Sequence, residues 1–163
     1  MKIGLMSDTH DRLDAVQRAV DLFNDLGAEH VLHAGDLNSP FVVPKLAQLK
    51  AKLHYVWGNN DGDRESITAK FNELGIKPLG NFASLRLGGR DIALLHGTHE
   101  PIVSALVKSG PFDAVVRGHT HRAVISGKKP LLINPGEVCG YLTGRQTVAV
   151  LDLITMKAKI LEI

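Results

Sequence analysis

The strongest constraint on the fold of this chain is a repeated alternation between short apolar runs, rich in β-branched residues, and segments with the period of an amphipathic helix. Such alternation is typical of strand–helix repeats, in which helices cover a sheet. The runs that we expect to form strands are KIGLM at 2–6, HVLHAG at 30–35, LHYVWG at 53–58, DIALLHG at 91–97 and DAVVRG at 113–118.

Three intervening segments are predicted to be helices. Residues 13–27 carry an apolar stripe at helical spacing and a glycine placed to end the helix. Residues 64–75 repeat the same arrangement, and residues 101–110 have a proline at a helix start and a glycine at its end.

The pattern changes after residue 130, where three strand-like runs follow one another without a helix: PLLIN at 130–134, TVAVLDL at 147–153 and AKILEI at 158–163. We expect antiparallel pairing here, added to a second sheet. The preferred architecture is therefore α/β, with two mixed β-sheets face to face and helices outside. A single doubly wound sheet is the alternative.

Composition fits one globular domain spanning residues 1–163, since 44% of the residues are hydrophobic and 22% are charged. A net charge of +2 is too small to indicate a nucleic-acid-binding surface. Cys139 is the only cysteine, which excludes an intrachain disulfide and a cysteine-rich zinc cage. The N-terminus lacks a signal-peptide core and no apolar run is long enough to span a membrane, so we expect a soluble cytoplasmic protein.

Polar side chains of metal-ligand type follow each of the first five apolar runs. Ligands of open α/β sheets bind beyond the carboxyl ends of the strands, so these residues should converge on one rim although they are far apart in sequence. The candidates are Asp8, His10, Asp36, Asn59, His96, His119 and His121.

The spacing and number of these residues predict a dinuclear metal site. Residues at i and i+2 of an extended segment project to the same side, so Asp8 can approach one ion together with His10. By the same reasoning, His119 and His121 can serve one ion or two neighbouring ions. Seven ligands are too many for one tetrahedral ion but suit two octahedral or five-coordinate ions that share a carboxylate.

The expected charge of such a site indicates the class of substrate. Two divalent ions, two aspartates and a bridging hydroxide sum to about +1, which favours an anion. Paired ions can activate a bridging water and stabilise the entering and leaving oxygens of an in-line displacement. Hydrolysis of a phosphate ester is the predicted reaction.

Five short motifs carry a resemblance to a known family: SDTH at 7–10, HAGD at 33–36, GNND at 58–61, LHG at 95–97 and GHTH at 118–121. With these motifs, in this order, the sequence resembles the calcineurin-like metallophosphoesterases, specifically their small bacterial and archaeal YfcE-type phosphodiesterases. The resemblance covers most of the chain and implies a four-layer αββα sandwich.

The resemblance also implies roles for the seven candidate ligands. It places Asp8, His10 and His121 on one ion and Asn59, His96 and His119 on the other. Asp36 would bridge both ions, and we take Asp36, Asn59 and His119 as the catalytic residues. Mixed nitrogen and oxygen ligands suit Mn, Fe, Co, Ni or Zn, of which we favour Mn.

Three positions depart from the family pattern. Asn60 stands where many larger members have a histidine that contacts the substrate, and an amide cannot be a general acid near neutral pH. Thr98 stands where the small subfamily often has a second histidine. We take Asn60 and Thr98 as substrate-binding residues. Glu137 replaces the serine of an Asn-Pro-Gly-Ser turn, and we assign it no catalytic role.

Two other functions were weighed against a phosphodiesterase acting on a small diester. A retromer subunit with the implied fold is a protein-interaction scaffold, but it departs from the ligand set that this chain retains in full. Metal-dependent amidohydrolases also use a His-x-His pair, but on an early strand of a barrel of about 250 residues. The enzyme is favoured, and a homo-oligomer, dimer or tetramer, is compatible with it.

Overall fold

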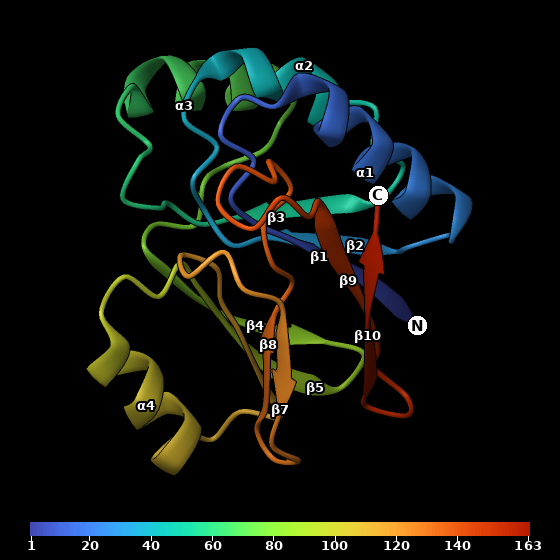
Figure 1. Cartoon of the computed structure of the whole chain (residues 1–163), viewed down its shortest axis with the longest axis vertical. Coiled ribbons are helices and arrows are strands. Elements are labelled where there is room, and N and C mark those ends of the chain that lie inside the picture. Colours follow the sequence, from blue (N-terminus) through green and yellow to red (C-terminus); the bar gives the residue numbers. More distant parts are fainter.

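The structure is a computed structural model that describes all residues from 1 to 163, and its strands form two five-stranded mixed sheets. The sheets pack face to face and helices cover both outer faces, which gives four layers (Figure 1). This arrangement confirms the αββα architecture and excludes the single doubly wound sheet.

The first sheet has the strand order β10-β9-β1-β2-β3. Strands β1, β2 and β3 run parallel, whereas β9 is antiparallel to both β1 and β10. Its strands are β1 (Lys2–Met6), β2 (His30–His33), β3 (Lys52–Tyr55), β9 (Thr147–Asp152) and β10 (Lys157–Glu162). The helices on its outer face are α1 (Leu13–Asp25), α2 (Val43–Leu46), which follows a 3-10 turn (Pro40–Val42), and α3 (Arg64–Glu73).

The second sheet has the order β4-β5-β6-β8-β7, in which β5, β6 and β8 run parallel and the two edge strands run antiparallel to their neighbours. Helix α4 (Glu100–Ser109) covers its outer face (Figure 1). The strands are β4 (Phe82–Leu87), β5 (Arg90–Leu95), β6 (Ala114–Val116), β7 (Val124–Ser126) and β8 (Leu131–Asn134).

The expectation for the C-terminal strands was partly wrong. Strands β9 and β10 are antiparallel, but they extend the first sheet next to β1. Strand β8 does join the second sheet, yet it runs parallel to β6. The period of the apolar residues predicts that a segment is a strand. The neighbour and the direction of that strand depend instead on contacts between residues that are distant in sequence.

The core has three layers, because the central strands are buried on both faces. Along β5, Ile92 and Leu94 face the opposing sheet whereas Ala93 and Leu95 face α4. This alternation follows from the two-residue period of a strand. It explains why these strands appear as continuous apolar runs in the sequence.

All three predicted helices are present. Helix α1 buries Val16, Val20 and Phe23 against the first sheet, and Gly27 follows its end with a positive φ of 63°. The Phe23 ring lies so close to β1 that a Cβ on Gly4 would come within 2.6 Å of it. A larger residue at Gly4 would therefore push α1 away from the sheet.

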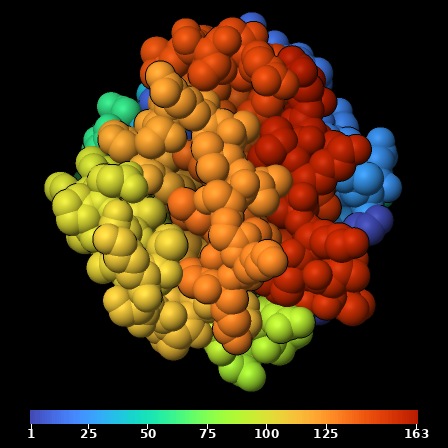
Figure 2. Space-filling model, turned by 60° about the horizontal axis from the view of Figure 1, so that its bottom comes forward, coloured from blue at the N-terminus to red at the C-terminus, as the bar shows by residue number.

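Strands β4 and β7 and helix α2 were not expected from the sequence. Both strands are sheet edges with exposed side chains, so they lack the continuous apolar run of a doubly buried strand. Strand β7 contacts β10 of the other sheet, and the surface in Figure 2 shows these segments side by side. No helix of this protein has both the length and the apolarity needed to cross a membrane.

Two histidines on neighbouring strands should make stability depend on pH. His30 Nδ1 and His54 Nε2 lie 3.0 Å apart on β2 and β3. Burial, helped by the charges of His30 and Lys52, lowers the pKa of His54 from 6.5 to about 4. The unfolded chain therefore binds a proton that the folded chain does not, so this stability is present above about pH 6.5 and is lost as the pH falls toward 4.

We expect the free energy of unfolding to fall by about 2 kcal/mol more in the unmodified chain than in His54→Gln between about pH 7.5 and about pH 5. Urea denaturation at both pH values measures the difference. The exposed His99 provides the control, since His99→Gln should retain the original pH dependence. Equal pH dependence in His54→Gln and the unmodified chain would contradict the expectation.

Candidate metal centre

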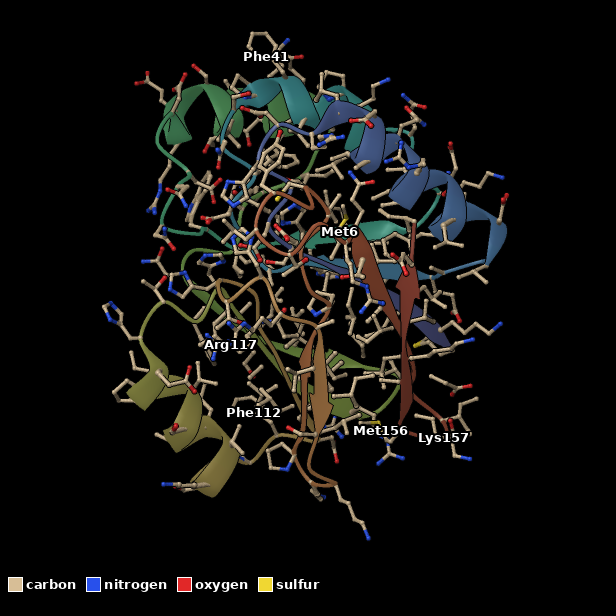
Figure 3. The ribbon with its side chains drawn as sticks, in the orientation of Figure 1. Met6, Phe41, Phe112, Arg117, Met156 and Lys157 are labelled. Atoms are coloured by element: carbon tan, nitrogen blue, oxygen red, sulfur yellow. The ribbon has the colours of Figure 1, made fainter.

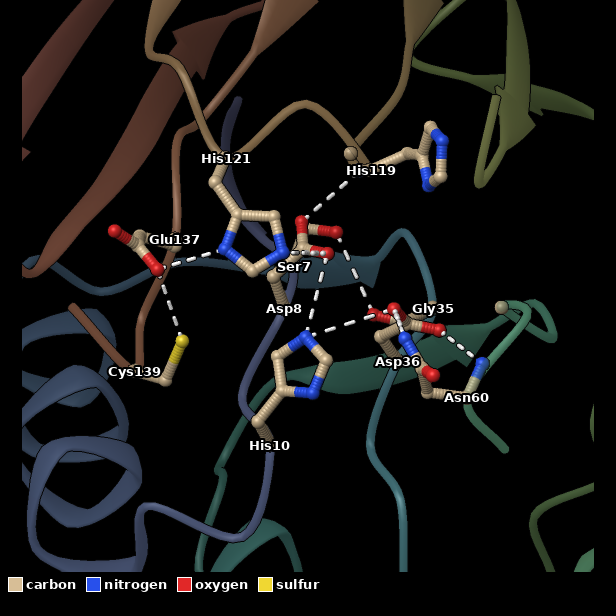
Figure 4. Close-up of polar contacts among 12 residues, drawn as sticks. Ser7, Asp8, His10, Gly35, Asp36, Asn60, His119, His121, Glu137 and Cys139 are labelled. Carbon is tan, nitrogen blue, oxygen red and sulfur yellow. Dashed lines mark hydrogen bonds and ion pairs between the residues drawn. The ribbon is translucent and has the colours of Figure 1, made fainter. Parts of the chain in front are cut away.

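The candidate site lies where the carboxyl ends of parallel strands from both sheets meet (Figure 4). The loops after β1, β2 and β3 approach from the first sheet, and the loops after β5, β6 and β8 approach from the second. The first sheet therefore supplies Asp8, His10, Asp36 and Asn59, and the second supplies His96, His119 and His121.

The backbone of these loops differs from the extended geometry assumed for the sequence. Asp8, His10, Asp36, His119 and His121 all have positive φ, between 39° and 69°. The i, i+2 alternation of a strand therefore does not apply, and that part of the sequence reasoning was wrong. The residues approach one another because left-handed residues curl the loops, a conformation that Asp and His adopt more readily than most residues.

Asp8, His10 and His121 form the first group. Asp8 Oδ1 lies 3.3 Å from His121 Nε2 and 3.8 Å from His10 Nε2. The two imidazole rings stack with their centroids 5.2 Å apart. Asp8 has no exposed surface, so its carboxylate is available only to groups inside this cluster.

Asp36 lies between the first group and the residues of the second sheet. Its Oδ2 is 3.5 Å from His10 Nε2 and 3.3 Å from His96 Nε2. Asn60 holds this carboxylate with two bonds of 2.8 Å, because its backbone N–H donates to Oδ1 and its side-chain amide donates to Oδ2. Ligand atoms of Asp8, His10 and Asp36 all lie within 4.8 Å of one another.

The second group, which consists of His96, His119 and Asn59, is more open. The ring of His119 lies against that of His96, with centroids 5.2 Å apart, and its backbone N–H donates to Asp8 Oδ2 over 3.1 Å. Asn59 is exposed at the rim, where its side-chain oxygen accepts a 3.3 Å hydrogen bond from the Thr98 hydroxyl. Both predicted substrate-binding residues therefore lie beside predicted ligands. Thr98 contacts Asn59, and Asn60 is hydrogen-bonded to Asp36.

Three buried ligand-type atoms in this cluster have no hydrogen-bond partner: Asp8 Oδ1, His10 Nε2 and His96 Nε2. An unsatisfied buried polar atom costs about 1–3 kcal/mol, and more when it is charged. His96 Nδ1 is already bound to the Ala34 carbonyl at 2.7 Å, which leaves Nε2 to face Asp36. Carboxylate oxygens and imidazole nitrogens are the ligands that divalent transition metals prefer, so this donor set fits such ions.

Ionisation within the cluster is dominated by its two carboxylates. Burial alone would raise the pKa of Asp36, but the facing His96 ring and the two hydrogen bonds from Asn60 lower it well below its usual range. Burial likewise opposes protonation of His10 and His96, yet Asp8 and Asp36 raise the pKa of both rings. The site thus concentrates negative charge that favours a cation.

Asp61 supports the loop that carries Asp36. Its carboxylate accepts four backbone N–H bonds of 2.6 to 3.1 Å, from Asp36, Leu37, Asn38 and Gly58. Gly58 is needed there, because a Cβ would lie 2.1 Å from Asp36 Oδ1. Asp61 therefore fixes the loop that carries Asp36.

Glu137 is a supporting residue that the sequence reasoning missed. It is fully buried, and its Oε2 lies 2.7 Å from His121 Nδ1. Burial opposes ionisation, but hydrogen bonds from His121 and from Thr143 lower the pKa of Glu137 to about 2. The signal was present in the sequence, since Glu137 follows the apolar run that becomes the parallel strand β8. That run had been assigned to antiparallel pairing, so the rule about carboxyl ends was not applied to it.

Cys139 and Arg117 are also buried beside the site. The Cys139 thiol donates to Glu137 Oε2 over 3.1 Å, and burial raises its pKa to about 12, which disfavours a thiolate nucleophile. Arg117, labelled in Figure 3, lies at the end of β6, where it pairs with Glu100 of α4 and donates to the Gly97 and Gly118 carbonyls. It ties the loops of His96 and His119 together.

Replacing Asp61 by asparagine should destabilise the fold by about 3 kcal/mol, because an amide turns a donor toward backbone N–H groups that need an acceptor. Urea denaturation measures the loss. Asp63→Asn is the matched control, since Asp63 caps α3 by accepting from Ser66 N–H at 3.1 Å and asparagine caps helices equally well. If both variants unfold at the same urea concentration, the role given to Asp61 is wrong.

Comparison with known proteins agrees with this geometry. Residues 1–156 match the model of the calcineurin-like phosphoesterase superfamily domain. The chain is 40% identical to Phosphodiesterase MJ0936 of Methanocaldococcus jannaschii over 154 residues, which is 93% of each chain. It is 34% identical to a probable metallophosphoesterase of Methanothermobacter thermautotrophicus, covering 83% of this chain and 76% of that protein.

Solved structures show the same relationship. The structure of an archaeal phosphodiesterase superposes with a TM-score of 0.94 at 37% identity, with both chains covered completely. The fold alone is shared with Yfce of E. coli (TM-score 0.70, 23% identity, 94% of this chain and 89% of that chain). It is also shared with Vps29 of Entamoeba histolytica (TM-score 0.72, 17% identity, 100% and 99%). The chain belongs to the calcineurin-like phosphoesterase superfamily.

Proposed function

We propose that this protein is a phosphodiesterase that depends on two divalent metal ions. The observation that carries the proposal is the set of three unpartnered buried atoms, Asp8 Oδ1, His10 Nε2 and His96 Nε2, around the Asp36 carboxylate. The name of the relative from Methanocaldococcus jannaschii supports the choice of a diester over a monoester.

In this proposal Asp8, His10 and His121 hold one ion, Asn59, His96 and His119 hold the other, and Asp36 contacts both. When bound, the ions would activate water and stabilise the charge on the phosphoryl oxygens. The ligand set accepts Mn, Fe, Co, Ni or Zn, with Mn and Ni as the first ions to test. The single cysteine is consistent with a reducing compartment, and we propose the cytoplasm.

The chain's own residues would fix the geometry of the reaction. The two bonds from Asn60 to Asp36 hold its Oδ2 toward His10 and His96. Glu137 orients His121 through its Nδ1, which leaves Nε2 for the ligand role. Burial and the charge of His96 lower the pKa of His119, so this ring needs no deprotonation before it binds a cation.

Protonation of the leaving group has no obvious side-chain donor. Asn60 points its amide at Asp36, and a neutral amide does not release a proton near neutral pH. Substrates with a stable leaving group, such as a nitrophenolate, should therefore react readily, and poorer leaving groups would take a proton from water.

The metal-loaded protein should hydrolyse bis(p-nitrophenyl) phosphate, and Asp36→Ala should lower the rate at least about 100-fold, because Asp36 contacts both proposed ion positions. Release of p-nitrophenolate measures the rate. Asp21→Ala, on the exposed face of α1, is the control and should retain full activity. Failure to hydrolyse any diester across a panel of Mn, Ni, Fe, Co and Zn, with metal shown to be bound, would favour the interaction scaffold instead.

His119→Ala should lower the metal content from two ions per chain toward one, because it removes a ligand from only one proposed position. Elemental analysis after removal of free metal measures this content. His99→Ala changes an exposed histidine that is outside the ligand set and should keep both ions. Two ions retained in His119→Ala would disprove the assignment of His119.

A further inference from the structure

A cavity of about 440 Å³ opens directly beside the candidate metal centre on the side of the second sheet. Three of the residues that line it, Asn59, His96 and Thr98, also belong to the candidate site. The cavity is therefore continuous with the position where a phosphoryl group would bind. Its volume lies within the range of about 300–1,000 Å³ that is usual for small-molecule pockets.

One wall of the cavity is a fixed planar surface. The Arg64 guanidinium lies over the ring of Trp57, with its Cζ 5.1 Å from the ring centroid. Two backbone carbonyls hold the guanidinium, because Arg64 donates to Asp61 O at 3.1 Å and to Gly58 O at 3.2 Å. Two flat groups held in this way are suited to contact another flat group.

Apolar side chains form other parts of the lining. Phe82 of β4 is 43% exposed and Ile102 of α4 is 52% exposed, and both line the cavity. Leu95 and Leu106 also line the cavity. Apolar surface left open beside a polar site indicates a ligand with an apolar part.

The charges of the lining restrict that ligand further. Arg64 contributes a positive charge, and no carboxylate lines the cavity. Arg64 occupies one face of the Trp57 ring, so that face cannot also hold a ligand cation, while Trp57 still lines the cavity. An ester whose organic group is cationic is therefore disfavoured here.

We propose that this cavity binds an aromatic organic group of the phosphodiester and so makes the enzyme selective for aromatic over small aliphatic diesters. Trp57, Phe82 and Ile102 are the residues that would contact the ring. The inference rests on the proposed function, because it uses the metal centre to place the phosphoryl group. It adds to that function the chemical class of the organic group that the diester carries.

Two phosphonates with the same charged head test the cavity without any turnover. Phenylphosphonate should bind the zinc-loaded protein about 10- to 100-fold more tightly than methylphosphonate, which is the gain expected from burying one ring. Calorimetry measures both affinities. Trp57 is the only tryptophan, so a change in its emission with phenylphosphonate but not methylphosphonate would locate the ring in this cavity.

Two variants and one control assign the preference to the cavity. Phe82→Ala and Ile102→Ala should each reduce the preference for phenylphosphonate at least about 3-fold and leave methylphosphonate binding unchanged. Phe41→Ala removes an exposed aromatic side chain at the far end of the molecule from α4 (Figure 3) and should keep the full preference.

The outcomes separate this inference from the proposed function. Equal affinity for the two phosphonates, or a preference that survives both variants, would overturn the aromatic cavity even if diesters are hydrolysed. A preference that is lost in both variants supports the cavity, even if no diester is hydrolysed and the proposed function fails.

Discussion

The candidate site depends on the packing of the two sheets against each other. Ile3 and Leu5 of the first sheet are fully buried in one apolar layer with Ile92 and Leu94 of the second. This layer brings the carboxyl ends of β1, β2 and β3 to those of β5, β6 and β8. Since Asp8 and Asp36 come from one sheet and His96 and His121 from the other, neither sheet alone contains the cluster. Hydrophobic burial at a distance from the site thus sets the distances between its polar atoms.

The cluster itself is costly for the fold. Two carboxylates are almost completely buried, and five of the proposed ligands have left-handed backbone conformations. Other residues offset this cost, since Asp61 satisfies four backbone N–H groups and Glu137 satisfies His121 Nδ1. A bound cation would provide a partner for the buried atoms of the cluster that have none. Stability and the capacity to bind metal are therefore linked in this protein.

The surroundings of the cluster differ on its two sides. Near His96 and Asn59 the cavity carries apolar and aromatic walls, whereas the smaller hollow beside His121 is lined by Arg122, Arg145 and threonines. A diester bound at the centre would thus meet an apolar environment in one direction and a polar, basic one in the other. Such asymmetry can fix which ester group faces which side, because each end of the substrate is desolvated by groups of different polarity.

The sequence by itself determined the local structure and the identity of the proposed ligands. The period of residues 13–27 predicted α1, continuous apolar runs predicted the doubly buried strands, and polar residues at their ends marked the rim. What it did not determine was the direction of β8, the sheet that β9 joins, and the positive φ of loop residues such as Asp8 and His119. For the same reason Glu137 was missed, although it follows a parallel strand as the ligands do. Side-chain period depends on neighbours in the chain, whereas strand partners, loop curvature and the cavity beside His96 depend on contacts between distant segments, which only the tertiary structure decided.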